Sequence, residues 1–217
     1  MLFKNINKYC INLEKRPERK ASVGKEFKRA GIDVEFWKAV DGSKLTINEK
    51  SSKADQYNAK GILGCLMSHV NLIKHAKRAN QEYIAVFEDD IKIASDFNKR
   101  IKYIEDNCPD FDMFYLGGHF VNDGADVKKT KDPFLYRAKS IAGTYAYILR
   151  DTVYDYILSN VSENLGADQM FVEFVQKRFK CYCFIPFLVD HLDGESDVAM
   201  TNIKYPATHK YYKDCYE

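Results

Sequence analysis

The stretch Tyr83-Ile-Ala-Val-Phe-Glu-Asp-Asp90 decides the fold, because five apolar residues run directly into three consecutive carboxylates. A short apolar run bounded by charge is typical of a strand that is buried on both faces. In extended geometry Glu88 and Asp90 face the same way, while Asp89 points in the opposite direction. In open α/β sheets ligands bind beyond the carboxyl ends of the strands, so the three acids are expected at a ligand site.

On either side of this stretch, strand patterns alternate with helix patterns. Further strands are predicted over residues 9–13, 34–40, 113–116, 144–149 and 181–189. Helices are predicted over 17–30, with Gly31 as the stop, over 62–79, and from Asp96, Asp151 and Asp168 onward. Residues 43–58 are expected to form a surface loop, and the segment 117–139 has little pattern. This alternation predicts one α/β domain over 1–217, with a mainly parallel central sheet and helices on both faces.

The composition argues against nucleic acid as a partner. The chain has 217 residues, and its 33 Lys and Arg against 31 Asp and Glu leave a net charge of only +2. Proteins that bind nucleic acid usually carry a basic excess, because neutralising phosphates dominates their affinity. The composition leaves the oligomeric state open.

The apolar segments and cysteines favour a cytoplasmic location. The start of the chain has no signal-peptide core, and the longest uncharged apolar stretch, 181–189, is too short to span a bilayer. Peripheral contact with a membrane is compatible with this pattern. Reduced thiols are expected for all six cysteines, since no pair has zinc-knuckle spacing; they are Cys10, Cys65, Cys108, Cys181, Cys183 and Cys215.

The acidic strand end favours a divalent cation. Two carboxylates on one side of a strand repel each other unless a cation lies between them. Mg²⁺ and Mn²⁺ take oxygen ligands and keep positions for phosphate oxygens, so either ion fits. The alternative is that these acids cap the following helix or lie solvated in a turn.

Several blocks of sequence, taken in order, resemble glycosyltransferase family 25, which includes lipooligosaccharide and collagen galactosyltransferases. The blocks are Tyr9-Cys-Ile-Asn-Leu-Glu-Lys-Arg-Pro-Glu-Arg19, Lys38-Ala-Val-Asp-Gly42, Gly61-Ile-Leu-Gly-Cys-Leu-Met-Ser-His69, Val86-Phe-Glu-Asp-Asp90, Tyr145-Ala-Tyr147, Ala167-Asp-Gln169 and Ser196-Asp197. Each block is weak alone, but together they span nearly the whole chain.

The resemblance implies a nucleotide-sugar-binding fold of the GT-A type and a glycosyltransferase that uses a UDP-sugar with Mn²⁺, or Mg²⁺, and inverts the anomeric centre. The sugar would be a hexose, galactose or glucose, and the acceptor a hydroxyl of a glycan, lipooligosaccharide or glycoprotein. The nucleotide-sugar-binding part would be residues 1–115, and the acceptor and catalytic part 116–217.

The resemblance also assigns roles to single residues. Asp90 and then Glu88 would be metal ligands, joined by His191 from late in the chain; the alternative for His191 is a surface histidine. Asp168 would be the general base that takes the proton of the acceptor hydroxyl. The alternative for Asp168 is an N-cap of the helix that begins there.

Donor binding would involve residues from four of these blocks, namely Asn12, Arg16, Arg19, Asp41, Gly42, Gly64, Ser68, His69 and Asp89. The two arginines could pair with phosphate oxygens or lie at the surface. Asp41 could hold the ribose or base, or simply form an Asp-Gly turn. His69 could reach the donor or be a core histidine bonded to a backbone carbonyl.

Four rings near strand ends could stack on sugar faces, namely Tyr115, His119, Tyr145 and Tyr147. Core packing is expected for at least two of them.

Two other functions compete with the transferase. A Mg²⁺-dependent phosphohydrolase would use a strand-end Asp as nucleophile but would leave the blocks at 9–19 and 61–69 without a role. A catalytically inactive glycan- or nucleotide-binding module would keep the fold without turnover.

Overall fold

The acidic strand lies in the interior of the main sheet of the computed structural model, which describes residues 2–46, 59–120, 126–192, 194–195, 198 and 202–203. This strand, β3 (Tyr83–Glu88), is flanked by β1 (Asn7–Asn12), which runs parallel to it, and β8 (Ala146–Arg150), which runs antiparallel. Residues 84–87 are fully buried. Burial on both faces explains why the strand is continuously apolar instead of alternating.

The sheet has eight strands in the order β2-β1-β3-β8-β5-β9-β7-β6. The other five are β2 (Glu35–Lys38), β5 (Met113–Tyr115), β6 (Val127–Lys129), β7 (Leu135–Ala138) and β9 (Cys181–Phe184). Six strands point the same way, and only β8 and β7 run against them. The predicted, mainly parallel sheet is therefore confirmed.

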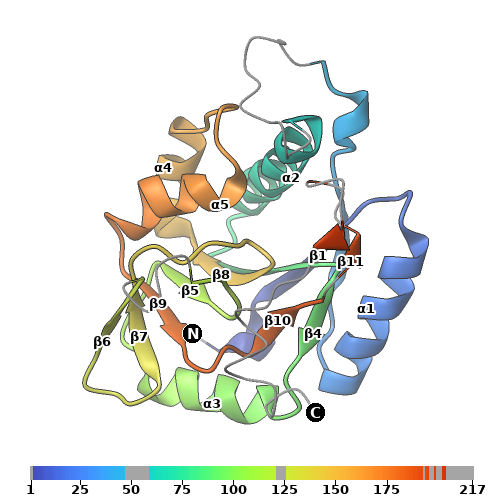
Figure 1. Ribbon diagram of the computed structural model, residues 1–217. Helices are drawn as coiled ribbons and strands as arrows, with labels where there is room; N and C mark the ends of the chain where they lie inside the picture. The colour runs from blue at the N-terminus through green and yellow to red at the C-terminus, as the bar shows by residue number, and fades with distance from the viewer. Residues whose placement is uncertain are drawn as a thin grey trace.

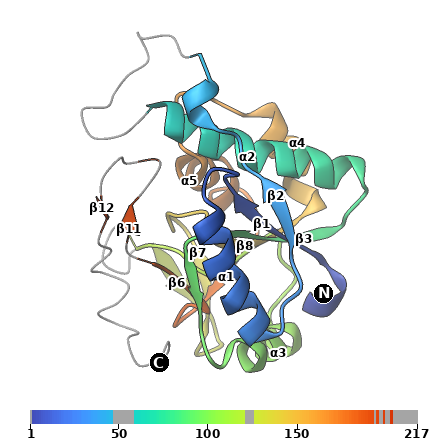
Figure 2. The ribbon, with the colours of Figure 1, turned by 90° about the vertical axis from the view of Figure 1, so that its right-hand side faces the viewer.

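Helices cover both faces of the sheet, as predicted (Figures 1 and 2). One face packs against α1 (Pro17–Ala30) and α3 (Phe97–Asn107). The other packs against α2 (Ala59–Arg78), α4 (Tyr154–Ser159) and α5 (Ala167–Met170). The first helix begins at Pro17 and stops before Gly31, which adopts φ 66°, because only glycine enters this left-handed conformation without steric cost.

The predicted strand over 181–189 is divided in two. After β9 the chain passes through a cis Ile185–Pro186 bond and resumes as β10 (Val189–His191). That strand pairs antiparallel with β4 (Ile91–Ile93), an element not predicted from the sequence, and His191 lies opposite Ile91. This small second sheet carries His191 next to the acidic strand end.

The segment 117–139, which had little pattern, contributes the edge strand β6 and its neighbour β7. Residues 121–125 and most of the predicted loop 43–58 lie outside the described part. The remaining short elements are η1 (Phe3–Asn5), η2 (Gly42–Lys44), η4 (Asp151–Val153), the π-helical η5 (Phe171–Gln176), β11 (Gly194–Glu195) and β12 (Asn202–Ile203).

The five described cysteines are all free. In the described part of the chain, every helix is too short or too polar to cross a membrane.

Candidate functional site

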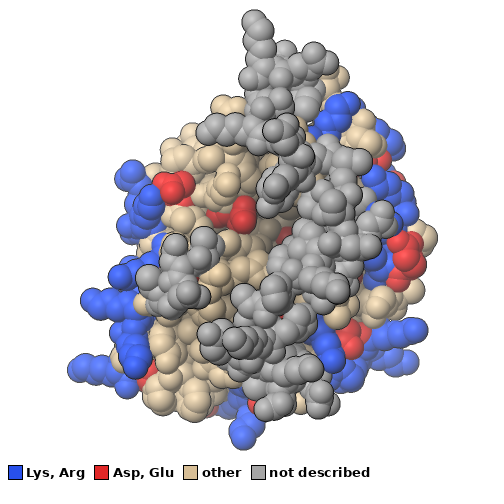
Figure 3. Space-filling model, in the orientation of Figure 1, with Lys and Arg blue, Asp and Glu red and all other residues tan. Residues whose placement is uncertain are grey.

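A pocket of about 770 Å³ lies beyond the carboxyl end of β3. Its walls come from the end of β1 and the start of α1, the loop after β2, one face of α2, the three acids, the segment before β8, the start of α5 and His191. Its size falls in the range of about 300–1,000 Å³ typical of ligand pockets. Figure 3 shows acidic side chains in the middle of this face and Lys and Arg side chains along its edges.

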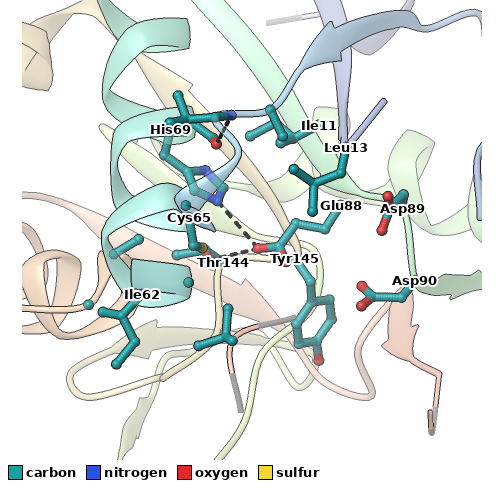
Figure 4. A pocket seen from close by; sticks show the side chains of 18 of the residues that line it. Ile11, Leu13, Ile62, Cys65, His69, Glu88, Asp89, Asp90, Thr144 and Tyr145 are labelled. Carbon is teal, nitrogen blue, oxygen red and sulfur yellow. Dashed lines mark hydrogen bonds and ion pairs between the residues drawn. The ribbon is translucent and has the colours of Figure 1, made fainter. Parts of the chain in front are cut away.

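All three carboxylates line this one pocket, so the prediction that Asp89 points away from the other two was wrong. The reason is that β3 ends at Glu88 and the chain bends at the next two residues. Strict alternation of side chains applies only while the backbone stays extended. Figure 4 shows Glu88 on the side of α2, with Asp89 and Asp90 farther along the pocket.

Glu88 is held by two neighbours. Its Oε1 accepts a hydrogen bond from Thr144 Oγ1 at 2.8 Å and lies 3.3 Å from His69 Nε2. Burial raises the pKa of Glu88, but the contacts with His69 and Thr144 and the charge of His191 together outweigh burial and leave this pKa below its usual value. Glu88 is therefore a carboxylate at neutral pH.

Both carboxylate oxygens of Asp89 have partners within the protein. Its Oδ2 accepts from Asn12 Nδ2 at 2.6 Å, and its Oδ1 lies 3.1 Å from Arg19 Nη1. Burial, followed by the charge of Asp90, raises its pKa to about 6. The amide of Asn12 also donates to the carbonyl of Arg16 at 3.2 Å. This side chain therefore joins the start of α1 to the turn that carries Asp89.

Asp90 has one oxygen with a cationic partner and one without a hydrogen bond. Oδ2 lies 2.9 Å from Arg19 Nη1. Oδ1 is buried and accepts no hydrogen bond from the described residues, although His191 Nε2 is 3.3 Å away. Burial and then the charge of Glu88 raise the pKa of Asp90, whereas His191 and Arg19 oppose this rise.

His191 lies beside this oxygen with one ring nitrogen already bonded. Its Nδ1 is 2.8 Å from the carbonyl oxygen of Leu192. A carbonyl can only accept, so Nδ1 carries a proton, and Nε2 is the ring nitrogen on the side of Asp90. A buried carboxylate oxygen without a hydrogen-bond donor is costly, and carboxylate and imidazole groups are both ligands of divalent cations. The residues present therefore fit a divalent metal ion.

Two aromatic neighbours support His191. Its ring centroid lies 5.3 Å from that of Tyr145 and 6.1 Å from that of His119. Burial, followed by the charge of His191, lowers the pKa of His119 to about 4, so His119 is neutral at physiological pH. Of the four rings considered from sequence, His119 and Tyr145 line the pocket, while Tyr115 and Tyr147 are fully buried core residues.

All the predicted site residues except Asn12 and Gly64 line the pocket. Gly64 instead faces the loop after β2, where an added Cβ would lie 2.8 Å from both Val40 O and Gly42 N. Ser68 fixes the same loop, because its Oγ accepts from Val40 N at 2.8 Å. The roles predicted for these residues toward a donor stay predictions.

Asp41 and Asp168 both line the pocket, the first from the loop after β2 and the second from α5. Hydrogen bonds from Ser43 and Lys15 hold the pKa of Asp41 below its usual value. Asp168 follows Gly166, which is the N-cap of α5, so Asp168 itself is not that cap. Its Oδ1 accepts from the N–H of Gln169 at 2.8 Å.

Sequence reasoning missed Cys65 and Thr144 as site residues. Cys65 stands four positions before His69 on α2 and faces the same pocket; this helical spacing was the available signal. Thr144 reaches Glu88 only because β8 runs antiparallel to β3, which places its N-terminal end beside the acids. That orientation had no local signal in the sequence.

Three relatives show what the chain is similar to. "Glycosyltransferase 25 family member" of Aedes aegypti is 34% identical over 124 residues, 50% of this chain and 20% of the relative. "Procollagen galactosyltransferase 1-A" of Xenopus laevis is 30% identical over 125 residues, with the same shares. "Inactive glycosyltransferase 25 family member 3" of Mus musculus is 27% identical over 159 residues, 65% of this chain and 26% of the relative. The matches thus cover only about a fifth to a quarter of these relatives.

The sheet, the acidic end of β3 and the pocket beyond it form a ligand site at the place where α/β sheets bind their ligands. The family model "Glycosyltransferase family 25 (LPS biosynthesis protein)" matches residues 5–171, and the chain belongs to this family. The mainly parallel sheet with helices on both faces is the α/β architecture expected from the sequence. The match ends before His191, so it is the three-dimensional arrangement that brings this residue to the site.

Proposed function

We propose that this chain is a metal-dependent glycosyltransferase that moves a hexose, galactose or glucose, from a UDP-sugar to an acceptor hydroxyl. Family membership supports the class of reaction. The observation that carries the metal dependence is the buried Oδ1 of Asp90, which faces His191 without accepting a hydrogen bond from any described residue.

Asp90 and His191 would hold Mn²⁺ or Mg²⁺, with Glu88 as a further carboxylate of the same pocket. When bound, the cation would neutralise negative charge on the diphosphate of the donor. Arg19 touches both Asp89 and Asp90. It therefore stabilises the two carboxylates before any ligand enters.

The donor would lie between the acids and the loop after β2. Arg16 and Lys15 line this end of the pocket and would attract phosphate oxygens. Asp41, bonded to Ser43 at the turn, would accept from the ribose or base. Galactose is supported as the sugar by the relative whose name is procollagen galactosyltransferase.

Asp168 would be the general base. The acceptor hydroxyl oxygen attacks the anomeric carbon as the bond to the nucleoside diphosphate breaks; the bonding electrons leave with the diphosphate, and the hydroxyl proton passes to the Asp168 carboxylate. Attack opposite the leaving group inverts the anomeric centre. The acceptor would be a glycan, lipooligosaccharide or glycoprotein, in keeping with the family description, and would approach over the predicted second part, 116–217.

An inactive binding module is the second candidate, favoured by the name of the mouse relative. Such a module would bind donor without turnover. Both candidates share the pocket, so only a measurement of chemistry separates them.

The test is a panel of UDP-, GDP- and CMP-sugars with and without Mn²⁺, read out as the release of free nucleotide in slow donor hydrolysis. We expect one UDP-sugar to be hydrolysed only with metal. Asp90→Asn should abolish this hydrolysis, whereas Asp155→Asn, at an exposed carboxylate that contacts Lys77 on the surface, should not. Binding without hydrolysis would support the inactive module, and failure to bind any nucleotide sugar would overturn the proposal.

A further inference from the structure

The inner wall of the pocket contains a group of potential metal ligands that the proposed function does not use together. Cys65 Sγ, a ring nitrogen of His69 and a carboxylate oxygen of Glu88 all lie within 4.8 Å of one another, and no other such group of three or more occurs among the described residues. The first two share one face of α2 because they are four residues apart. Glu88 meets them from the end of β3 (Figure 4).

The distance between His69 and Glu88 suits a tetrahedral ion. His69 Nε2 and Glu88 Oε1 are 3.3 Å apart. Nitrogen and oxygen ligands about 2.0–2.1 Å from tetrahedral Zn²⁺ would be separated by about 3.3–3.4 Å. The pocket side of the group leaves a fourth position, as in sites where Zn²⁺ has three protein ligands.

The ring of His69 is oriented by an outer partner. Its Nδ1 lies 2.9 Å from the hydroxyl of Tyr147, a fully buried side chain. This contact fixes the ring so that Nε2 is the nitrogen on the side of Glu88. Metal-binding histidines commonly have such a partner on the second ring nitrogen.

The ligand types separate this group from the site at Asp90. Thiolate and imidazole ligands favour Zn²⁺, whereas Mn²⁺ and Mg²⁺ favour carboxylates and water. Burial, followed by the charge of Glu88, raises the pKa of the Cys65 thiol, so the thiol is protonated before a metal enters. Only a cation with high affinity for thiolate displaces that proton.

We propose that Cys65, His69 and Glu88 form a second cation site, which binds Zn²⁺ on the wall of the donor pocket. On binding, a zinc–sulfur bond forms and the thiol proton is released to solvent. The ion would coordinate Glu88 and reduce the space next to the donor site. Zn²⁺ would therefore inhibit donor binding. The site depends only on these three side chains and stands independently of the transferase reaction.

The first test is a titration of the metal-free chain with Co²⁺ in the absence of nucleotide sugar. Bonding of cobalt to a thiolate gives a charge-transfer band in the near ultraviolet, which Zn²⁺ should remove by displacement. We expect the band in the unsubstituted chain and in Cys108→Ser, a half-buried cysteine that does not line the pocket. Cys65→Ser should lose the band and weaken Zn²⁺ binding by more than the ~10–100-fold typical of losing an outer partner.

A second test needs no substitution and therefore holds even if Cys65→Ser does not fold. N-ethylmaleimide is applied with and without Zn²⁺, and the labelled peptides are quantified by mass spectrometry. Zn²⁺ should protect Cys65 but not Cys108, and the same concentration of Mn²⁺ should protect neither. Equal labelling of Cys65 with and without Zn²⁺, or a cobalt band that persists in folded Cys65→Ser, would overturn the proposal. Because neither readout uses a sugar donor, its failure is distinguishable from failure of the proposed function.

Discussion

Three adjacent carboxylates have three different environments. Glu88 is bound by Thr144 and lies next to His69, and both oxygens of Asp89 have partners within the protein. Only Asp90 keeps a buried oxygen to which no described residue donates. Substitutions of neighbouring residues should therefore have separable effects, some on folding and others on chemistry.

Asn12 provides the clearest case of such a separation. Its amide donates to the carboxylate of Asp89 in the interior, and a hydrogen bond to a charged group contributes about 1.5–3 kcal/mol. Asn12→Ala should lower the free energy of unfolding in urea by about that amount. The control is Asn107→Ala, at an exposed amide that donates to the carbonyl of Tyr103. Unchanged stability combined with weaker donor binding would instead support the direct donor contact predicted from the sequence.

Asp168 should affect chemistry and leave binding intact. Its carboxylate lines the pocket and is bonded only locally, to the N–H of Gln169, among the contacts described for it. General-base catalysis contributes about 10²–10⁴-fold, so Asp168→Asn should reduce the rate of transfer by that factor. Glu173→Gln is the control, because this exposed carboxylate of η5 pairs with Lys177 at the surface. A large loss of UDP or Mn²⁺ affinity in Asp168→Asn would contradict its role as base.

Most of the site residues predicted from the sequence line the pocket, because short blocks after strands bring polar groups to one edge of the sheet. The sequence did not distinguish side chains that face the ligand from those that support them. Asn12 and Gly64 are supporting residues, a difference that depends on tertiary contacts. Cys65 was considered only as a small apolar residue.

Among the elements, the segment before β8 connects several parts of the site. Thr144 in this segment bonds Glu88, and the backbone N–H and carbonyl of Ile141 are both bonded by the buried amide of Gln176. Gln176 ends the π-helical η5, which continues directly from α5 and Asp168. The elements carrying the proposed base and the metal-site carboxylate are thus joined by buried hydrogen bonds.

The contact between α2 and the loop after β2 can be tested with two glycines. Gly64→Ala would place a Cβ 2.8 Å from two backbone atoms, Val40 O and Gly42 N, which must move. Gly24 on α1 has no atom within 4 Å of such a Cβ, so Gly24→Ala should stabilise the chain by about 0.5–1 kcal/mol through helix propensity. Gly64→Ala should be destabilising despite the same gain, and should weaken donor binding because this loop lines the pocket. Equal stabilisation by both substitutions in thermal unfolding would show that the contact is loose.

The sequence predicted long elements well and short ones poorly. The first two helices were found because periodic apolar residues and a Pro start or Gly stop are local signals. Strands such as β4, β6 and β10 contain only three residues, too few for a periodic pattern, and they form because a distant partner pairs with them. The position of His191 depends on one of these pairings, so its metal role could be inferred only from the resemblance.

For the whole molecule, the pocket combines both predicted parts of the chain. Residues before 115 supply the acids and the loop after β2, and residues after 116 supply Thr144, Asp168 and His191. With a net charge of only +2, the chain as a whole provides little attraction for an anionic donor. Under the proposed function, binding of the donor would depend on the local balance between the acids, the nearby basic side chains and a cation.

A bound cation should therefore stabilise the entire fold. A ligand that binds only the folded state stabilises it by about 2.7 kcal/mol at 100 times its Kd, and for a chain of this size each kcal/mol raises Tm by about 2–4 °C. Mn²⁺ together with UDP should thus raise Tm by about 5–10 °C, and EDTA should reverse the shift. Asp90→Asn should remove the shift and Asp155→Asn should keep it, because only Asp90 faces His191 in the pocket. If Asp90→Asn responds to Mn²⁺ as strongly as the unsubstituted chain, the cation binds elsewhere and Asp90 is not its ligand.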